Sequence, residues 1–138
     1  MKENQKRMYI FTAVFAAIAP FILWPIEIFF PYPHIVEELA KALLIFFILK
    51  SGDNRQKIYA TILIGFLFGI TENFLYLFSP ATSQTHLFRF MVTMPLHITT
   101  SLAILIPALL DKRLLFLGIV LAGLLHYFYN TSVSLLVF

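Results

Sequence analysis

The chain has 138 residues, of which 60% are hydrophobic and only 12% are charged. A soluble domain of this size needs more surface charge, so the composition excludes one and indicates a protein that lies in a bilayer. The net charge is +3, and the basic residues lie in short segments between apolar runs. Because they form no basic stripe on a helix, a nucleic-acid partner is excluded. The absence of cysteine excludes thiol nucleophiles and cysteine-ligated zinc.

Five apolar runs follow one another along the chain. They predict transmembrane helices at about residues 8–30, 34–50, 58–79, 87–110 and 114–138. Runs of roughly 17 to 25 residues are long enough to cross about 30 Å of hydrocarbon as helices. A membrane barrel would need alternating segments of about 10 residues, and no such alternation occurs. We therefore predict an all-α, polytopic helix bundle that forms a single transmembrane domain over residues 1–138.

The basic residues predict the orientation in the membrane. Eight of the ten lysines and arginines fall before the first run or beside the loops after the second and fourth runs: Lys2, Lys6, Arg7, Lys50, Arg55, Lys57, Lys112 and Arg113. Arg89 is the one that falls on the opposite side. Because cytoplasmic segments are enriched in lysine and arginine, we expect a cytoplasmic N-terminus and an outer C-terminus. The small size and the lack of a targeting signal favour the cell membrane of a prokaryote.

Several ionisable side chains lie within the apolar runs. They are Glu37, Glu38, Lys41, Glu72, His97 and His126. Each costs a few kcal/mol in lipid unless it faces protein or water, so such residues usually mark a functional site. Steps of four residues place the polar groups of each run on one face. Counting along the helices puts Glu37 about 5 Å, Glu72 about 10 Å and both histidines about 15 Å below the outer surface.

Carboxylates and imidazoles at matching depth can activate water and stabilise an oxyanion. Other intramembrane chemistries lack their residues, since Asp53 and Asp111 lie in loops, and neither a His-Glu-x-x-His nor a Gly-x-Ser-x-Gly motif occurs. Two alternatives remain open: a proton or cation relay, and a non-catalytic scaffold that binds a partner helix through Gly65-x-x-x-Gly69. We interpret Glu27, His34 and His86 as structural or solvated residues.

Four motifs resemble those of the PrsW intramembrane protease family, in the same order. Glu37-Glu38-Leu39-Ala40-Lys41 resembles E-E-x-x-K, and Phe68-Gly69-Ile70-Thr71-Glu72-Asn73 resembles F-x-x-x-E-N. His97-Ile98-Thr99-Thr100-Ser101 resembles H-x-x-x-small, and His126-Tyr127-Phe128-Tyr129-Asn130 resembles H-x-x-x-N. The resemblance runs from about residue 34 to the end. The family is akin to the type II CAAX prenyl proteases.

The resemblance implies catalytic roles for Glu37, Glu38, Lys41, Glu72, Asn73, His97, His126 and Asn130. Glu37 and Glu38 would polarise the attacking water, with Glu72 and His97 helping to hold it. His126 and Asn130 would stabilise the oxyanion, and Lys41 would orient the glutamate pair. The implied substrate is a membrane protein of the anti-sigma-factor kind, cleaved on the outer side of the membrane. Compared with longer family members, the chain is expected to be a minimal core without their additional helices.

Two versions of the chemistry stay open with respect to a cofactor. Glu72, His97 and His126 can serve as three ligands of a divalent metal such as zinc, with Glu37 as the base. The same residues can also work without a metal, with Glu37 activating water directly. We slightly favour a site that holds no metal or holds it weakly.

Overall fold

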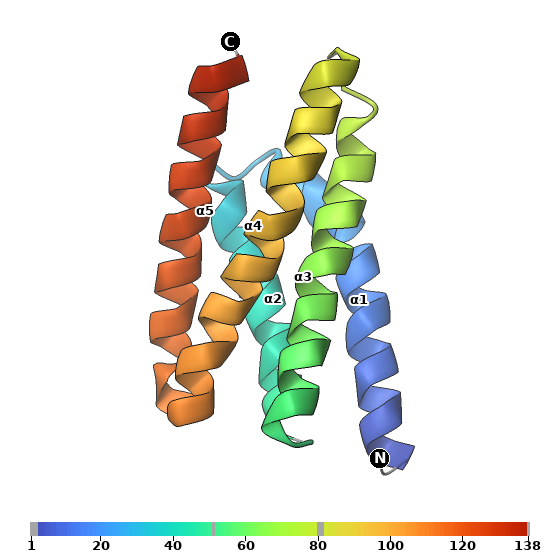
Figure 1. Cartoon of the computed structure of the whole chain (residues 1–138), viewed down its shortest axis with the longest axis vertical. Helices are drawn as coiled ribbons and strands as arrows, with labels where there is room; N and C mark the ends of the chain where they lie inside the picture. The colour runs from blue at the N-terminus through green and yellow to red at the C-terminus, as the bar shows by residue number, and fades with distance from the viewer. Residues whose placement is uncertain (1–2, 51, 80–81, 138) are drawn as a thin grey trace.

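The computed structural model describes residues 3–50, 52–79 and 82–137, with side chains through residue 132. Lys2 and Phe138, which the sequence predictions include, lie outside this range. The elements are α1 (Glu3–Glu27), α2 (Pro33–Leu49), α3 (Asn54–Tyr76), α4 (Ser83–Leu110), the short 3₁₀ turn η1 (Lys112–Leu114) and α5 (Leu115–Val137) (Figure 1). The described residues form no strand, which confirms the predicted all-α bundle.

Polar loop residues fix where the helices begin. Asp53 caps α3, because its Oδ1 accepts a hydrogen bond of 2.8 Å from the backbone N–H of Gln56. Thr82 caps α4 in the same way through the backbone N–H of Thr85, at 3.2 Å. Gly52 has φ +82°, a conformation that glycine adopts without steric cost, and it completes the turn between α2 and α3.

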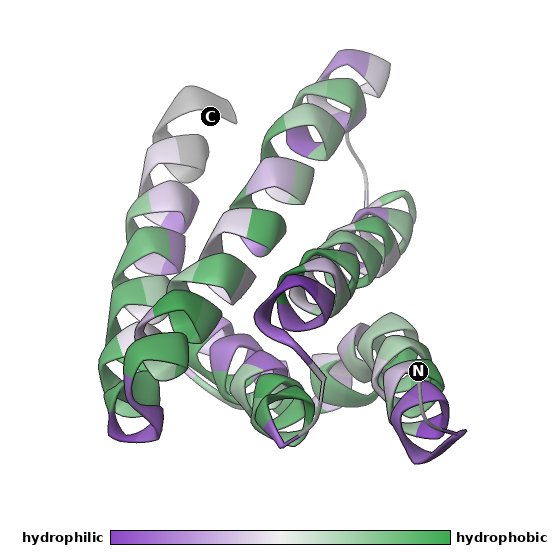
Figure 2. Ribbon diagram, turned by 60° about the horizontal axis from the view of Figure 1, so that its bottom comes forward, coloured by the Kyte–Doolittle hydropathy of each residue, from purple (hydrophilic) through white to green (hydrophobic). Residues whose placement is uncertain are grey.

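Four segments are long and apolar enough to cross a membrane: Glu3–Glu27, Asn54–Tyr76, Ser83–Leu110 and Lys112–Ser132. Their outward surfaces carry exposed phenylalanine, leucine and isoleucine, and hydrophobic colour covers most of the bundle in Figure 2. The chain is therefore a multi-pass membrane protein. α2 has 17 residues, about 26 Å of helix, and it packs against all four other helices.

The connection between α1 and α2, residues 28–32, lies lower in Figure 1 than the upper ends of α4 and α5. It is apolar, and Phe29 is 87% exposed. Backbone N–H groups of the connection bond back to the end of α1: those of residues 28, 29 and 30 reach carbonyls of Trp24, Ile26 and Glu27 at 3.1–3.2 Å. Pro31 and Pro33 have no N–H to satisfy. The connection is thus built to tolerate an apolar environment.

Two glycines bring α3 against α4. A Cβ atom on Gly65 would lie 2.5 Å from the backbone oxygen of His97, and one on Gly69 would lie 2.9 Å from the sulfur of Met94. The helix that packs on Gly65-x-x-x-Gly69 is therefore α4 of the same chain, where the scaffold alternative needed a helix of a partner. This contact places the Gly65–Gly69 stretch of α3 directly beside His97.

Gly65→Ala is expected to destabilise the protein by about 1–3 kcal/mol, because the added methyl group overlaps backbone that cannot move freely. The matched control is Gly123→Ala, where an added Cβ meets nothing within 4 Å. Both variants gain the same helix propensity from alanine. The difference between their thermal unfolding temperatures in detergent therefore measures the destabilisation caused by the steric overlap with α4. Equal unfolding temperatures for the two variants would show that α4 can yield at this point.

Apolar and polar groups separate along the bundle. Apolar side chains fill the interior toward the end where α1 begins: Ala42, Ile45, Ile48, Ile64, Ile104, Leu105 and Ala108. Toward the opposite end, where α2 begins and α3 ends, the interior is occupied by buried ionisable groups. The packed apolar layer closes the bundle toward the start of α1. The buried ionisable groups can therefore be reached only from the opposite end or from the sides of the bundle.

Candidate active site

The first turns of α2 carry three charged residues into the interior. The exposed fractions of Glu37, Glu38 and Lys41 are 8%, 1% and 0%. The helix begins at Pro33, whose fixed φ suits a first helical position. Neither glutamate lies in the first turn of α2, so the helix dipole contributes little to their charge.

Lys41 links α2 to α4. Its ammonium Nζ donates to Glu38 Oε1 at 2.6 Å and to Thr100 Oγ1 at 2.7 Å, and it lies 3.2 Å from His97 Nδ1. An ammonium has three N–H donors and no acceptor, so these partners account for all of them. Thr100 was not among the predicted site residues, although it lies three residues after His97 and therefore on the same helix face.

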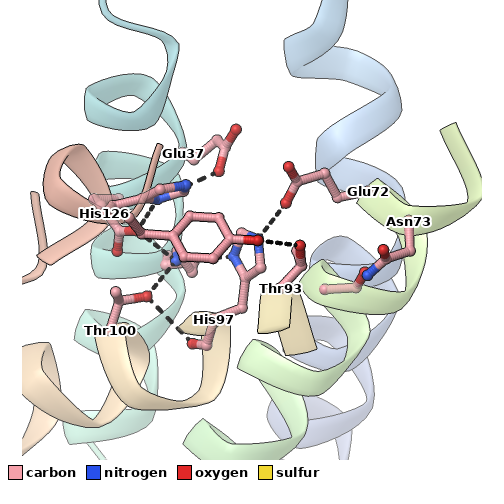
Figure 3. A network of polar contacts seen from close by, with 11 residues as sticks. Glu37, Glu72, Asn73, Thr93, His97, Thr100 and His126 are labelled. Carbon is pink, nitrogen blue, oxygen red and sulfur yellow. Dashed lines mark hydrogen bonds and ion pairs between the residues drawn. The ribbon is translucent and has the colours of Figure 1, made fainter. Parts of the chain in front are cut away.

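The contact with Lys41 determines how His97 presents its ring. A charged lysine can only donate, so His97 Nδ1 accepts and the ring proton is assigned to Nε2. Nε2 contacts Glu72 Oε2 from α3. His97 is fully buried and the Glu72 side chain is 15% exposed. Lys41, His97 and Glu72 thus form a polar chain from α2 through α4 to α3. Figure 3 shows its last link, in which Glu72 and the His97 ring point toward one another.

His126 joins the same network from α5. Its Nδ1 lies 2.8 Å from Glu38 Oε1 and 3.7 Å from Glu37 Oε2. In a neutral ring the hydrogen bond to Glu38 places the proton on Nδ1 and leaves a lone pair on Nε2. Glu38 Oε1 therefore accepts from both Lys41 and His126, and this one atom connects α2 with α5.

Glu37 differs from Glu38 because neither Lys41 nor His126 holds it by a hydrogen bond. Glu37 Oε2 is buried and has no hydrogen-bond partner among the described residues. Glu37 lines two adjoining cavities of about 310 and 230 Å³, together with Glu72 and Tyr76. Of the two adjacent glutamates, Glu38 is held in place and Glu37 is available to a molecule in the cavity.

The structure brings together all the predicted site residues except Asn73. Asn130 is exposed and lines the 230 Å³ cavity with Glu37 and His126. The side-chain amide of Asn73 donates instead to the backbone oxygen of Gly69, at 2.7 Å. Asn73 lines a separate cavity of about 220 Å³ beside Arg89. It lies on a different face of α3 from Glu72.

The sequence analysis missed one carboxylate at the site. Glu27, interpreted there as structural or solvated, lines both cavities that contain Glu37 and Glu72. Its Oε1 is buried and has no hydrogen-bond partner among the described residues. A signal was present in the sequence, because Glu27 is a carboxylate within the apolar run predicted as a helix over residues 8–30. α1 therefore contributes one wall and one carboxylate to the cavities that contain Glu37 and Glu72.

A divalent metal fits these residues. Ligand atoms of Glu37, His97 and His126 all lie within 4.8 Å of one another. The unpartnered oxygen of Glu37 needs a donor or a cation, and a carboxylate with two imidazoles is a set that zinc accepts. Glu38 on His126 Nδ1 is the carboxylate partner that metal-binding histidines commonly have. The group contains Glu37 where the sequence analysis named Glu72, which contacts His97 instead.

A family model described as PrsW family intramembrane metalloprotease matches residues 5–138. The chain belongs to the PrsW family. The match includes α1, so it extends beyond the motifs that begin at Glu37. No curated protein and no solved structure shows a significant match to the chain. Membership of the PrsW family, together with the membrane-spanning helices, supports an intramembrane protease, and the description as a metalloprotease agrees with the group formed by Glu37, His97 and His126.

Proposed function

We propose that this PrsW family member hydrolyses a peptide bond in or next to a membrane segment of another protein, with Glu37 as the general base. The observation that carries the proposal is the contrast between the two adjacent glutamates. Glu38 is fixed by hydrogen bonds from Lys41 and His126, whereas Glu37 has neither bond and lines the cavities that also contain Glu72. A base needs a free acceptor within reach of a water molecule, and Glu37 has one.

The proposed reaction assigns one proton path. Glu37 takes a proton from a water molecule as the water oxygen attacks the carbonyl carbon of the scissile bond. When the carbon–nitrogen bond breaks, Glu37 gives that proton to the leaving amine. Atoms and charges balance, because water supplies one hydrogen to the amine and the hydroxyl to the acyl product. Glu72 borders the same space and orients the water, and His97 positions Glu72 through its Nε2.

Donors for the developing oxyanion come from α5. Asn130 lines the cavity beside Glu37 and carries an amide N–H₂ group. His126 donates from Nε2 when both ring nitrogens carry protons, and offers Nε2 as a metal ligand when only Nδ1 does. Hydrogen-bond donors that are fixed before the reaction stabilise an oxyanion more strongly than mobile water does.

Glu37, His97 and His126 are the residues that would hold a divalent metal, which would supply Lewis-acid polarisation of the scissile carbonyl. Glu37 would then use one carboxylate oxygen as the ligand and the other as the base. His97 would have to release its Nε2 proton to become a ligand, and Glu72 is placed to receive it. Lys41 and Glu38 keep both rings oriented with or without the ion.

We further propose that the whole chain is one transmembrane domain with a cytoplasmic N-terminus in the cell membrane. The basic residues near the start of α1 and around the α2–α3 and α4–α5 turns support this orientation. It places the site in the outer half of the bilayer, because α2 begins and α3 ends on that side. An anti-sigma-factor-like membrane protein is the substrate class that fits such a site.

The test is cleavage of a library of single-pass membrane proteins in proteoliposomes. The wild type is compared with a Glu37→Ala/Glu38→Ala variant, each with and without a chelator. We expect cleavage by the wild type only, and the chelator arm determines whether the reaction requires a metal. A folded wild-type protein that cleaves nothing in a broad library would support a scaffold or a proton relay instead, and a proton-flux assay would separate those two.

A further inference from the structure

A different cavity lies between α2 and α5, on the other side of α2 from the cavities that contain Glu37. Its volume is about 370 Å³. The wall is mainly apolar and includes Ile35 from α2 and Val120, Gly123 and Leu124 from α5. Glu38 also lines it. The adjacent glutamates therefore face two different spaces, a polar one and an apolar one.

Gly123 keeps this cavity open. The other glycines of the chain stand close to neighbouring groups: a Cβ on Gly65, Gly69 or Gly118 would come within 3 Å of atoms in α4. A Cβ on Gly123 would meet nothing within 4 Å. Gly123 is thus not required for helix packing, and any larger side chain at this position would project into unfilled space.

The cavity is continuous with the catalytic network through Glu38. Glu38 Oε1 is held by Lys41 and His126, but Oε2 is buried without a hydrogen-bond partner among the described residues. The residue is only 1% exposed. A buried carboxylate oxygen is costly unless a donor reaches it. A lipid acyl chain has no donor, whereas a peptide has a backbone N–H at nearly every residue.

We infer that this cavity is a subsite for a large apolar side chain of the substrate, adjacent to the scissile bond. Glu38 Oε2 accepts a hydrogen bond from a backbone N–H of the same substrate segment. The inference rests on the proposed peptidase function, and it specifies the substrate class: membrane segments with leucine- or phenylalanine-sized residues next to the cleaved bond. Small residues at that position leave the cavity unfilled and are cleaved less efficiently.

The first experiment fills the cavity with Gly123→Phe and measures how strongly the protein prefers a substrate with leucine to one with alanine. Two versions of a cleaved test protein carry leucine or alanine beside the mapped cleavage site. The leucine-to-alanine ratio of kcat/KM is expected to fall at least about tenfold, the range for changes of one or two methylenes in an apolar pocket. Leu121→Phe, on the same helix but 43% exposed and outside the cavity, is the matched control and keeps the wild-type ratio. An unchanged ratio in Gly123→Phe overturns the subsite.

The second experiment does not depend on turnover. The chain has no cysteine, so Gly123→Cys introduces a unique thiol into an inactive Glu37→Gln background. A single cysteine is moved along the membrane segment of the test protein, and disulfide capture is recorded at each position. We expect one sharp maximum beside the cleavage site, and a flat profile overturns the subsite. A sharp maximum together with no cleavage by the wild type would count against the peptidase and leave the subsite standing.

Discussion

Glu37→Gln is expected to reduce the cleavage rate by about 10²–10⁴-fold, the usual contribution of a general base. Glutamine has the same shape but cannot take a proton from water. The fold should be retained, because Glu37 Oε2 makes no hydrogen bond that glutamine would break. Product formation from a fixed test substrate in proteoliposomes, with thermal unfolding in detergent alongside, measures both quantities.

Glu38→Gln is the matched control for this prediction, since it changes the next residue in the same way. It should lower stability as well as activity, because the charge of Glu38 Oε1 holds Lys41 and His126. The two adjacent variants therefore separate a chemical role from a positioning role. Wild-type rates in Glu37→Gln would remove Glu37 as the base, and loss of stability in Glu37→Gln alone would reverse the proposed assignment.

Lys41→Met is expected to lower the free energy of unfolding by about 3–5 kcal/mol, because it leaves Glu38 as a buried charge without its partner. Methionine fills a similar volume, so packing at this fully buried position changes little. Activity should fall with stability, since His97 Nδ1 and Thr100 lose their donor as well. Denaturant unfolding in micelles, followed by the fluorescence of the single tryptophan, measures the change.

The double variant Lys41→Met/Glu38→Gln is the control for that loss. Removing both charges should restore much of the stability, because replacing a buried ion pair by neutral groups is often close to neutral. Catalysis should stay low, since His126 then lacks its carboxylate. A double variant no more stable than Lys41→Met alone would show that the lysine stabilises the fold through packing and not through charge.

The fold was predictable because the bilayer restricts the choices. Long apolar runs ending at charged loops leave helices as the only open-chain solution. Steps of four residues also predicted which ionisable groups share a face, and the structure places Lys41, His97, Glu72 and His126 in one network. These predictions need only the helix repeat and the depth of each residue.

The pairing within the network was not predictable from spacing. Adjacent helical residues differ by about 100° around the axis, so Glu37 and Glu38 face different cavities, and which one meets His126 most closely depends on how the helices cross. The metal-ligand prediction named Glu72 in place of Glu37 for the same reason. Asn73 was expected at the site, but a short amide can bond to its own helix, and this one reaches the carbonyl of Gly69.

The apolar connection between α1 and α2 has a consequence for the surrounding lipid. The backbone of residues 28–30 is bonded internally, and the connection ends lower than α4 and α5, so its exposed side chains rest in acyl chains instead of among headgroups. Because α2 is only about 26 Å long, shorter than a hydrocarbon layer of about 30 Å, we expect the lipid to thin beside the connection and relieve the hydrophobic mismatch. We expect water to approach the glutamates from this flank, and under the proposed function a substrate helix would meet the thinnest hydrocarbon there.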